Sequence, residues 1–418
     1  MKVMWVCNIV LPCIAKQIGE PIKNTGGWLI GILDLLKKEE NTEIAIVCPT
    51  SQNIEKQLDG LTCFGFSSPS IEKFSEYINK FKPDIIHIFG TETWHSHCMI
   101  MSAKKENMVN HTVVSIQGLV SVYAQHYTGY LSAKEVLLGM TIRDFIKGNI
   151  YRQQRQFVKK GVYEQDTIRL AEHIIGRTEW DKACVKRLNN NVNYYSCNES
   201  LRAAFYNHMG MWCVENCERH SIFVTQYGYP LKGFHLMLDA LADVKKDFPD
   251  VKLYTTGKNL FALSQKELIM ESFYHKYIRK KIVDLGLKDN VRFLGNLNEE
   301  EMSLRLLKTH VFVCPSSIEN SPNSLGEAML IGTPCISSDV GGVKSLFNDG
   351  IDGMLYPSDE PYMCAYYVKK IFRNDELAKT YSINAVKHAS ITHNKIANNK
   401  KLLQIYEIVR GKSNETIL

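Results

Sequence analysis

Val311–Gly342 reads VFVCPSSIENSPNSLGEAMLIGTPCISSDVGG, and this stretch decides the expected fold. The apolar run at 311–314 predicts a buried strand, which ends in a polar loop that carries Glu319. The pattern after the loop predicts a helix that begins near Asn323 and carries Glu327 on its first turn. Together these features predict a strand–loop–helix unit of an open α/β sheet, in which ligands bind at the carboxyl ends of the strands.

The two glutamates are separated along the chain, but one lies in the loop and the other on the helix, so both can face one cleft. The free backbone N–H groups at the helix start, near Ser324 and Leu325, favour a phosphate. A phosphate there, one carboxylate for ribose hydroxyls and another for a sugar would together form a nucleotide-sugar site. The alternative is a surface loop followed by an amphipathic helix with ordinary exposed glutamates.

This stretch resembles the E-x7-E signature of the GT-B glycosyltransferases of family 4, a retaining group also called glycosyl transferases group 1. The resemblance extends to Ala328, the GTP turn at 332–334 and the pair Gly341-Gly342. It implies a GT-B fold, an α/β architecture in which two Rossmann-like domains face each other across a cleft. It also implies that Glu319 contacts the transferred sugar as a catalytic residue and that Glu327 binds the ribose of the donor.

One departure from the family lies inside the signature. The family commonly has glycine three positions after the first glutamate, and this chain has Pro322. Proline has no N–H to donate to a sugar or phosphate, although it suits the approach to a helix start. We expect Asn320 and Asn323 to supply sugar-hydroxyl contacts instead, and the donor preference to differ as a result.

Lys232-Gly233 follows the first strand of the second half of the chain and resembles the KG motif of the family. A solvated ammonium at this helix start would neutralise a leaving diphosphate. The family usually has arginine five positions earlier, where this chain has Tyr227. Either Tyr227 supplies a neutral hydrogen bond to the phosphates, or a cation such as Lys258 or Arg292 reaches them.

Three features of the first half also point to the cleft. The loop Thr25-Gly26-Gly27 follows the first strand and resembles the diglycine loop of the family, so Gly26 and Gly27 are expected beside the donor phosphate. His87 and Gln117 stand at the ends of two strands, and we assign both a catalytic role. Gln117 replaces a histidine that the family often has; glutamine cannot carry a proton but can position a hydroxyl. For His87 a structural role is an equal alternative.

The sequence predicts neither a metal nor a cofactor. No D-x-D pattern occurs, so a metal-held diphosphate lacks its usual signature, and Lys232 with helix dipoles is expected to carry the charge. The cluster Cys213, Cys217 and His220 is a zinc candidate, but its spacing fits no common ligand arrangement. No Walker A or G-x-G-x-x-G pattern supports an ATP or dinucleotide site.

The length of 418 residues predicts two domains. We expect residues 1–205 to form an acceptor-binding domain, with a helix in 395–418 packing back on it, and residues 206–394 to bind the donor. Alternating strands and helices support two parallel sheets. In the first half strands are expected at 2–9, 43–48, 84–89, 112–116 and 173–176. In the second half they are expected at 221–225, 251–255, 291–294, 311–314 and 335–337.

Charge and hydropathy bound the possible partners. The net charge of +6 is too modest to indicate nucleic acid, and no apolar run approaches the ~20 residues of a membrane span. The N-terminus lacks the pattern of a signal peptide, so we expect a cytoplasmic protein. The stretch 143–160 has six cations against Asp144, with apolar residues interleaved, which suits an anionic membrane surface at the inner face of the membrane or a phosphate-bearing acceptor. The alternative is a solvated helix packed on the domain.

The resulting interpretation is a retaining glycosyltransferase of cell-surface polysaccharide synthesis. It would move a sugar from a nucleotide-diphosphate sugar to a hydroxyl of a glycan or lipid-linked glycan. Two alternatives stay open: a nucleotide-sugar epimerase or hydrolase, and a catalytically inactive GT-B binding module. The departures at Tyr227, Pro322 and Gln117 keep the last alternative open.

Overall fold

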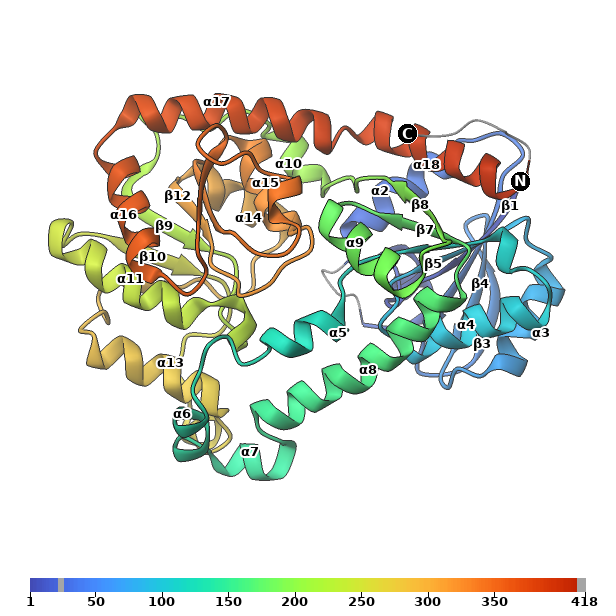
Figure 1. The fold of residues 1–418 in the computed structure, drawn as a ribbon, viewed down its shortest axis with the longest axis horizontal. Helices are drawn as coiled ribbons and strands as arrows, with labels where there is room; N and C mark the ends of the chain where they lie inside the picture. Colours follow the sequence, from blue (N-terminus) through green and yellow to red (C-terminus); the bar gives the residue numbers. More distant parts are fainter. Residues whose placement is uncertain (22–25, 412–418) are drawn as a thin grey trace. The chain divides into compact units, whose positions relative to one another are not determined.

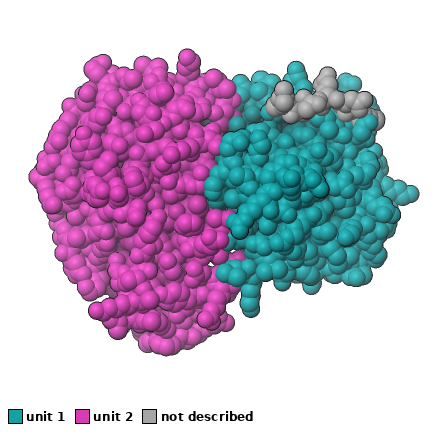
Figure 2. All heavy atoms as spheres, viewed as in Figure 1, with its two compact units in different colours: residues 1–121, 158–202, 393–418 teal, residues 122–157, 203–392 magenta. Residues whose placement is uncertain are grey.

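The computed structural model describes residues 1–21 and 26–411, which divide into two compact units (Figure 2). Unit 1 comprises the described parts of 1–121, 158–202 and 393–418, and unit 2 comprises 122–157 and 203–392. Each unit has its own sheet with helices around it (Figure 1). The expected α/β architecture with two parallel-sheet domains is therefore confirmed.

The sheet of unit 1 has the strand order β3-β4-β2-β1-β5-β6-β7-β8 in the described part of the chain. Every pairing is parallel except that of β3 with β4. Its strands are β1 (Lys2–Val6), β2 (Glu43–Pro49), β3 (Ile54–Leu58), β4 (Leu61–Phe66), β5 (Ile85–Phe89), β6 (Thr112–Ser115), β7 (His173–Gly176) and β8 (Asn193–Ser196). Its helices are α1 (Pro12–Ile18), α2 (Gly27–Leu36), α3 (Ile71–Phe81), α4 (Trp94–Lys105), α9 (Glu179–Leu188) and α18 (Lys395–Val409), with a 3₁₀ turn at Val109–His111.

The centre of this sheet is apolar on both faces. Strand β5 reads IIHIF and is buried throughout, as expected for a central parallel strand covered by helices. Helix α18 closes the core from the far end of the chain, because Leu402, Ile405 and Tyr406 pack among the residues of β1 and β2. The indole N–H of Trp5 donates to the hydroxyl oxygen of Tyr406 at 3.0 Å, as a C-terminal helix packing back on the first domain would require.

The sheet of unit 2 has the strand order β11-β10-β9-β12-β13-β14, with parallel pairing in the described residues. Its strands are β9 (Glu218–Val224), β10 (Lys252–Thr255), β11 (Val291–Phe293), β12 (Thr309–Cys314), β13 (Cys335–Ser338) and β14 (Gly353–Tyr356). Its helices are α6 (Ala133–Leu138), α7 (Ile142–Lys147), α10 (Ala203–Asn207), α11 (Phe234–Asp247), α12 (Gln265–Ile269), α13 (Phe273–Asp284), α14 (Glu299–Leu307), α15 (Asn323–Ile331), α16 (Pro361–Phe372) and α17 (Asp375–Thr392). The 3₁₀ turns are Ala124–His126, Pro230–Lys232 and Val343–Ser345, while α5 (Val120–Tyr123) and α8 (Ile150–Leu170) carry the chain between the units.

The units differ from the expected division in one segment. Residues 122–157 lie before position 205 in the sequence, yet they belong to unit 2 because their polar groups bond there. The carbonyl of Gly129 accepts from His235 at 2.7 Å, and Asp144 accepts from the backbone N–H of Phe273 at 2.9 Å. A single division of the chain at position 205 therefore does not account for residues 122–157.

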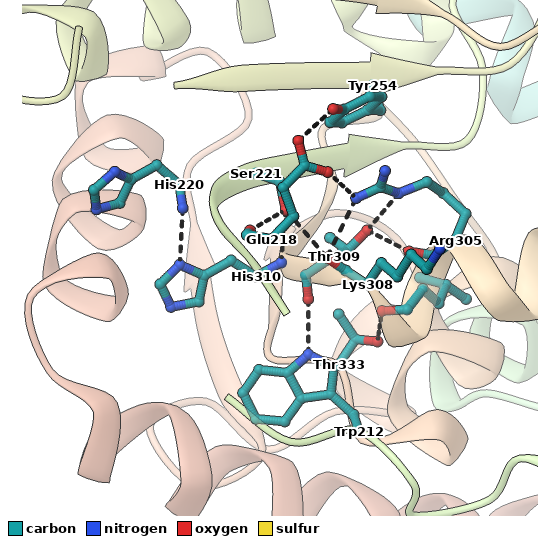
Figure 3. Close-up of polar contacts among 11 residues, drawn as sticks. Trp212, Glu218, His220, Ser221, Tyr254, Arg305, Lys308, Thr309, His310 and Thr333 are labelled. Atoms are coloured by element: carbon teal, nitrogen blue, oxygen red, sulfur yellow. Dashed lines mark hydrogen bonds and ion pairs between the residues drawn. The ribbon is translucent and has the colours of Figure 1, made fainter. Parts of the chain in front are cut away.

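A polar network anchors the amino ends of β9 and β12, at the edge of the sheet away from the candidate site (Figure 3). The indole of Trp212 donates to the carbonyl of Thr309 at 2.7 Å, and the backbone N–H of His310 donates to the hydroxyl of Ser221 at 3.0 Å. Arg305 pairs with Glu218 at 3.0 Å. The polar segment before β9 thus holds two central strands in register.

Candidate functional site

The carboxyl end of β12 carries the central part of the E-x7-E segment. The strand is buried at every position, and a loop of eight residues leads from it to α15, which begins at Asn323 as expected. Glu319 in the loop is 7% exposed and Glu327 in the helix is 4% exposed. Glu327 lies one turn further in than expected, because the first turn of α15 contains no acidic residue. Both carboxylates are therefore buried, which rules out ordinary exposed glutamates.

Glu319 pairs with Lys232, which stands 87 positions earlier. Its Oε1 lies 2.5 Å from the Nζ of Lys232 and accepts from the hydroxyl of Ser316 at 2.7 Å. The ammonium is not solvated as expected, because the side chain of Lys232 is only 17% exposed. Burial disfavours its charged form, but the attraction of Glu319 and Tyr229 outweighs this effect and raises the pKa of Lys232 above its ordinary value. The lysine thus stays protonated beside a carboxylate.

Two glycines allow the three motifs to meet. Gly233 has φ +67°, and a Cβ there would lie 1.7 Å from the carbonyl oxygen of Pro315. Gly341 has φ +52°, and a Cβ there would lie 2.0 Å from the carbonyl oxygen of Glu319. Only glycine suits such a conformation at such close approach. The KG turn, the E-x7-E loop and the diglycine turn therefore converge on the backbone around Glu319.

The start of α15 has the properties of an anion site. Its N-cap is Pro322, which makes no side-chain bond to the helix start, and the backbone N–H of Leu325 donates to the carbonyl of Pro322 at 3.0 Å. The side chains of Asn323 and Ser324 are half-buried, and Leu325 is buried. The backbone N–H of Asn320 donates to the hydroxyl oxygen of Tyr123 at 2.8 Å, which fixes the loop before the helix. The positive end of the helix dipole favours a phosphate here.

Neither Lys258 nor Arg292, the two cations named as candidates, is paired with the phosphate site beside Lys232 in the described residues. The hydroxyl of Tyr227 donates to the carbonyl of Lys258, and its ring packs on Phe234 and Phe293. The ammonium of Lys258 pairs with Glu267. Arg292 is exposed on the edge strand β11, where its guanidinium donates to the carbonyl of Val291 at 3.0 Å. The roles expected for Tyr227 and Arg292 in phosphate binding stay predictions.

In unit 1 the diglycine loop packs against the end of β1. Gly26 has φ +79°, and a Cβ there would lie 1.9 Å from Cδ1 of Ile9. Gly27 is the first residue of α2, whose start also has no side-chain cap among the described residues. Thr25 lies outside the described residues. Strands β1 and β5 adjoin at the point where the strand order reverses direction, which is where open sheets bind ligands.

His87 has a structural environment. Its Nδ1 lies 2.6 Å from the hydroxyl oxygen of Tyr406 and its Nε2 lies 2.7 Å from that of Ser115. It is 1% exposed, and burial lowers its pKa to about 3. Because both ring nitrogens are engaged and the ring stays neutral, we assign His87 a structural role instead of the expected catalytic one.

Gln117 belongs to a polar chain at the carboxyl ends of β6, β7 and β8. Its amide donates to Oε1 of Glu199 at 2.7 Å, and Oε2 of Glu199 pairs with Arg177 at 2.9 Å. Beside this chain lies a cavity of about 30 Å³, lined also by Asn198 and Asn399. Gln117 is half-buried and held in place, which suits the positioning role expected for it.

Two acidic residues of unit 1 were missing from the expected site. Burial raises the pKa of Glu92, just after β5, and raises that of Glu164 in α8 to about 7. Glu164 accepts from the backbone N–H groups of Val120 and Ser121 at 2.6 and 3.0 Å. The sequence could have indicated Glu92, because it follows a predicted strand. It could not have indicated Glu164, which lies in a long helical pattern and contacts residues that are remote in sequence.

The described residues hold no group of three or more His, Cys, Asp or Glu side chains that could bind a metal ion. In the segment weighed for zinc, the thiol of Cys217 contacts the carbonyl oxygen of Val214 at 3.3 Å. His220 pairs with Asp250 at 2.8 Å. These contacts belong to the packing at the start of β9.

Comparisons with known proteins match the second half of the chain to a family model. Residues 217–388 match the family model described as glycosyl transferases group 1. The phosphatidyl-myo-inositol mannosyltransferase of Mycobacterium leprae is 27% identical over 193 residues, which are 46% of this chain and 45% of that protein. The chain thus matches less than half the length of this curated relative.

Solved structures share the fold over nearly the whole chain. Sucrose-phosphate synthase from Thermosynechococcus elongatus has a TM-score of 0.72 at 15% identity, with 99% of this chain and 100% of that chain covered. Anabaena HepE in complex with UDP and glucose has a TM-score of 0.65 at 15% identity, with 97% and 99% covered. Residues 217–388 therefore match the glycosyl transferases group 1 model, within a chain that has the GT-B fold.

Proposed function

We propose that the protein is a glycosyltransferase that moves a sugar from a nucleoside-diphosphate sugar to a hydroxyl of a glycan or lipid-linked glycan, in cell-surface polysaccharide synthesis. The observation that carries this proposal is the buried pair of Lys232 and Glu319, the latter in the loop that leads into the start of α15. It combines a positive charge, the positive end of a helix dipole and a carboxylate, which are the groups that a diphosphate and a sugar require. The family match supports the same reaction.

In this proposal, different residues bind the diphosphate, the ribose and the transferred sugar of the donor. The start of α15 and the ammonium of Lys232 take the diphosphate, Glu327 takes the ribose, and Glu319 takes hydroxyls of the transferred sugar. An ammonium has three donors, so Lys232 can keep Glu319 while it binds a phosphate oxygen. As the bond to the sugar breaks, negative charge grows on the diphosphate, and Lys232 stabilises that charge more than it stabilises the intact donor.

The transfer is proposed to retain the anomeric configuration of the sugar. A departing phosphate oxygen on the face that the acceptor enters can receive the proton of the attacking hydroxyl. This route needs no histidine base, which agrees with the neutral, enclosed His87 and the non-titrating Gln117. Gln117 then holds a hydroxyl of the reacting sugar. The anomeric configuration of the product, read by NMR, tests this part of the proposal.

The reaction is proposed to need no divalent metal, since Lys232 and α15 supply the positive charge. Activity should survive an excess of EDTA. A loss that magnesium or manganese restores would show that the diphosphate is held differently.

The decisive experiment measures consumption of a panel of nucleotide sugars with and without glycan acceptors. A transferase consumes donor only with acceptor, a hydrolase or epimerase consumes it without, and an inactive module does neither. Lys232→Ala should lower turnover about 10²–10³-fold. Lys281→Ala is the matched control, because Lys281 is 18% exposed and also pairs with a carboxylate, that of Asp239. Retention of more than about a third of the rate in Lys232→Ala would refute the role of Lys232.

A further inference from the structure

Two short helices of unit 2, α6 and α7, expose five large apolar side chains within ten residues. These are Leu137, Leu138, Ile142, Phe145 and Ile146, with exposed fractions from 57% to 77%. We call this set the α6–α7 patch. Scattered exposed apolar residues are normal, but a cluster of this kind marks an interaction site.

The patch is held rigidly by its own unit. Ser132 and Thr141 each form a capping box, so both short helices have satisfied starts. Asp144, within α7, also accepts from the backbone N–H of Phe273 and so caps α13. Gly139 lies so close to the ring of Phe273 that a Cβ would approach it to 2.3 Å. Figure 1 shows α6 and α7 beside α13. The apolar side chains are therefore presented outward by a fixed hairpin.

The charges around the patch are unbalanced. The carboxylates of these elements are already engaged: Glu135 with Tyr277, Asp144 with two helix starts, and Glu271 with Arg279. By contrast, exposed cations flank the patch and have no ion pair within the described residues; they are Lys134, Lys147, Arg152, Arg155 and Lys266. Apolar side chains ringed by unpaired cations match the interface of an anionic bilayer.

We propose that the α6–α7 patch docks on an anionic lipid surface. Phe145 and its apolar neighbours enter the boundary between headgroups and acyl chains, while the surrounding cations contact lipid phosphates. A second copy of the chain is a poorer occupant, because a symmetric contact would bring the same unpaired cations face to face. No helix of the described residues is long and apolar enough to span a bilayer, so the contact is a peripheral one.

This surface differs from the basic amphipathic stretch expected over 143–160. Gly148, with φ +97°, ends α7, and α8 begins afresh at Ile150. Ile150 is buried, and the ring of Phe157 packs on Tyr127 at 4.7 Å, so these two do not face solvent as an insertion face would. The apolar contribution comes from α6 and α7, and the first turns of α8 add cations.

The test is partition onto vesicles of phosphatidylglycerol and phosphatidylcholine, measured by co-sedimentation. Wild-type protein should bind the anionic vesicles, bind pure phosphatidylcholine weakly, and lose binding as salt rises. Phe145→Ser with Ile146→Ser should weaken partition more than about tenfold. Lys134→Glu with Lys147→Glu and Arg152→Glu should do the same. In a separate variant, Phe145→Trp should give a blue-shifted emission on binding.

A matched control changes an equally exposed aliphatic and a cation elsewhere in unit 2. Ile383 is 69% exposed and Lys387 is exposed on the same helix, so Ile383→Ser with Lys387→Glu should leave partition unchanged. Circular dichroism and thermal melting show whether each variant is folded. Failure of wild-type protein to sediment at low salt, or an equal loss in the control, would overturn the proposal. So would a dimer in light scattering that Phe145→Ser makes monomeric.

The docking proposal does not depend on the proposed function, although membrane docking would bring the enzyme to a lipid-linked acceptor. Vesicle binding without sugar transfer would leave the docking surface intact and contradict only the proposed function. Sugar transfer to a soluble acceptor without vesicle binding would support the transferase reaction and contradict only the docking proposal.

Discussion

At the scale of single residues, Lys232 and Glu319 link stability to ligand binding. Both side chains are largely withdrawn from water, so removal of one leaves the other charge without its counter-ion. We expect Lys232→Ala to lower the free energy of unfolding by roughly 2–3 kcal/mol. Urea denaturation measures this change.

The double variant Lys232→Met with Glu319→Gln separates stability from chemistry. It removes both charges at similar volume, so it should regain most of the lost stability while turnover stays low. A Lys232→Ala protein that is as stable as wild type would show that Glu319 finds water or another donor.

Glu164 predicts a pH dependence of stability. Burial raises its pKa from the ordinary 4.5 to about 7, so between these values the native state holds a proton that the unfolded chain has lost. Stability conferred by this group is therefore complete below about pH 4.5 and declines as pH rises to about 7. The stability of wild type relative to Glu164→Gln should fall by up to about 3 kcal/mol across this window. Chemical unfolding of both proteins at several pH values checks it, and a constant difference would contradict it.

Single residues also show where sequence reasoning ends. The pattern identified Glu319, Glu327 and Lys232, because strand ends and helix starts are local features. It could not show that Lys232 and Glu319 are partners, since they are 87 positions apart. Nor could it decide between a structural and a catalytic His87, because the deciding hydroxyl, that of Tyr406, comes from the other end of the chain.

At the scale of elements, the turn between η3 (Pro230–Lys232) and α11 sets the position of the site. Gly233→Ala should lower stability by about 2 kcal/mol or more and weaken nucleoside-diphosphate binding, because the new Cβ would push Pro315 and the E-x7-E loop away. Gly228→Ala is the control, since nothing lies within 4 Å of its Cβ position. Calorimetric titration with the nucleoside diphosphate measures the binding. Equal affinity in the two variants would mean that the loop is held by other contacts.

Four strands of the structure were not expected from the sequence, and three of them, unlike the largely buried and apolar β4, share a physical cause. Strands β3 and β8 are short and polar, and β3 reads IEKQL on the edge of its sheet, so neither shows a buried apolar run. Strand β14 contains a glycine and only four residues. The expected strands that the structure contains are mainly central ones, whose two covered faces require continuous apolar runs.

At the scale of the whole molecule, unit 1 is completed by segments from both ends of the chain. Tyr406 in α18 bonds to Trp5 in β1 and to His87 in β5. Tyr406→Phe would leave the indole N–H and the imidazole Nδ1 buried without this partner, at a cost of roughly 2–4 kcal/mol. Scanning calorimetry should show a lower melting temperature for that variant. Tyr366→Phe, at a 59% exposed site, should melt like wild type. A stable Tyr406→Phe protein would mean that water replaces the hydroxyl.

The interleaved path of the chain also has a consequence for biosynthesis. On the ribosome, β1 to β8 emerge long before α18, so residues 203–392 of unit 2 are made before Leu402, Ile405 and Tyr406 arrive to cover the sheet of unit 1. Domains generally fold as they are made, from the N-terminus onward. Here the last-made helix closes the first-made sheet, so nascent chains stalled before residue 395 would carry an open apolar face and be targets for chaperones.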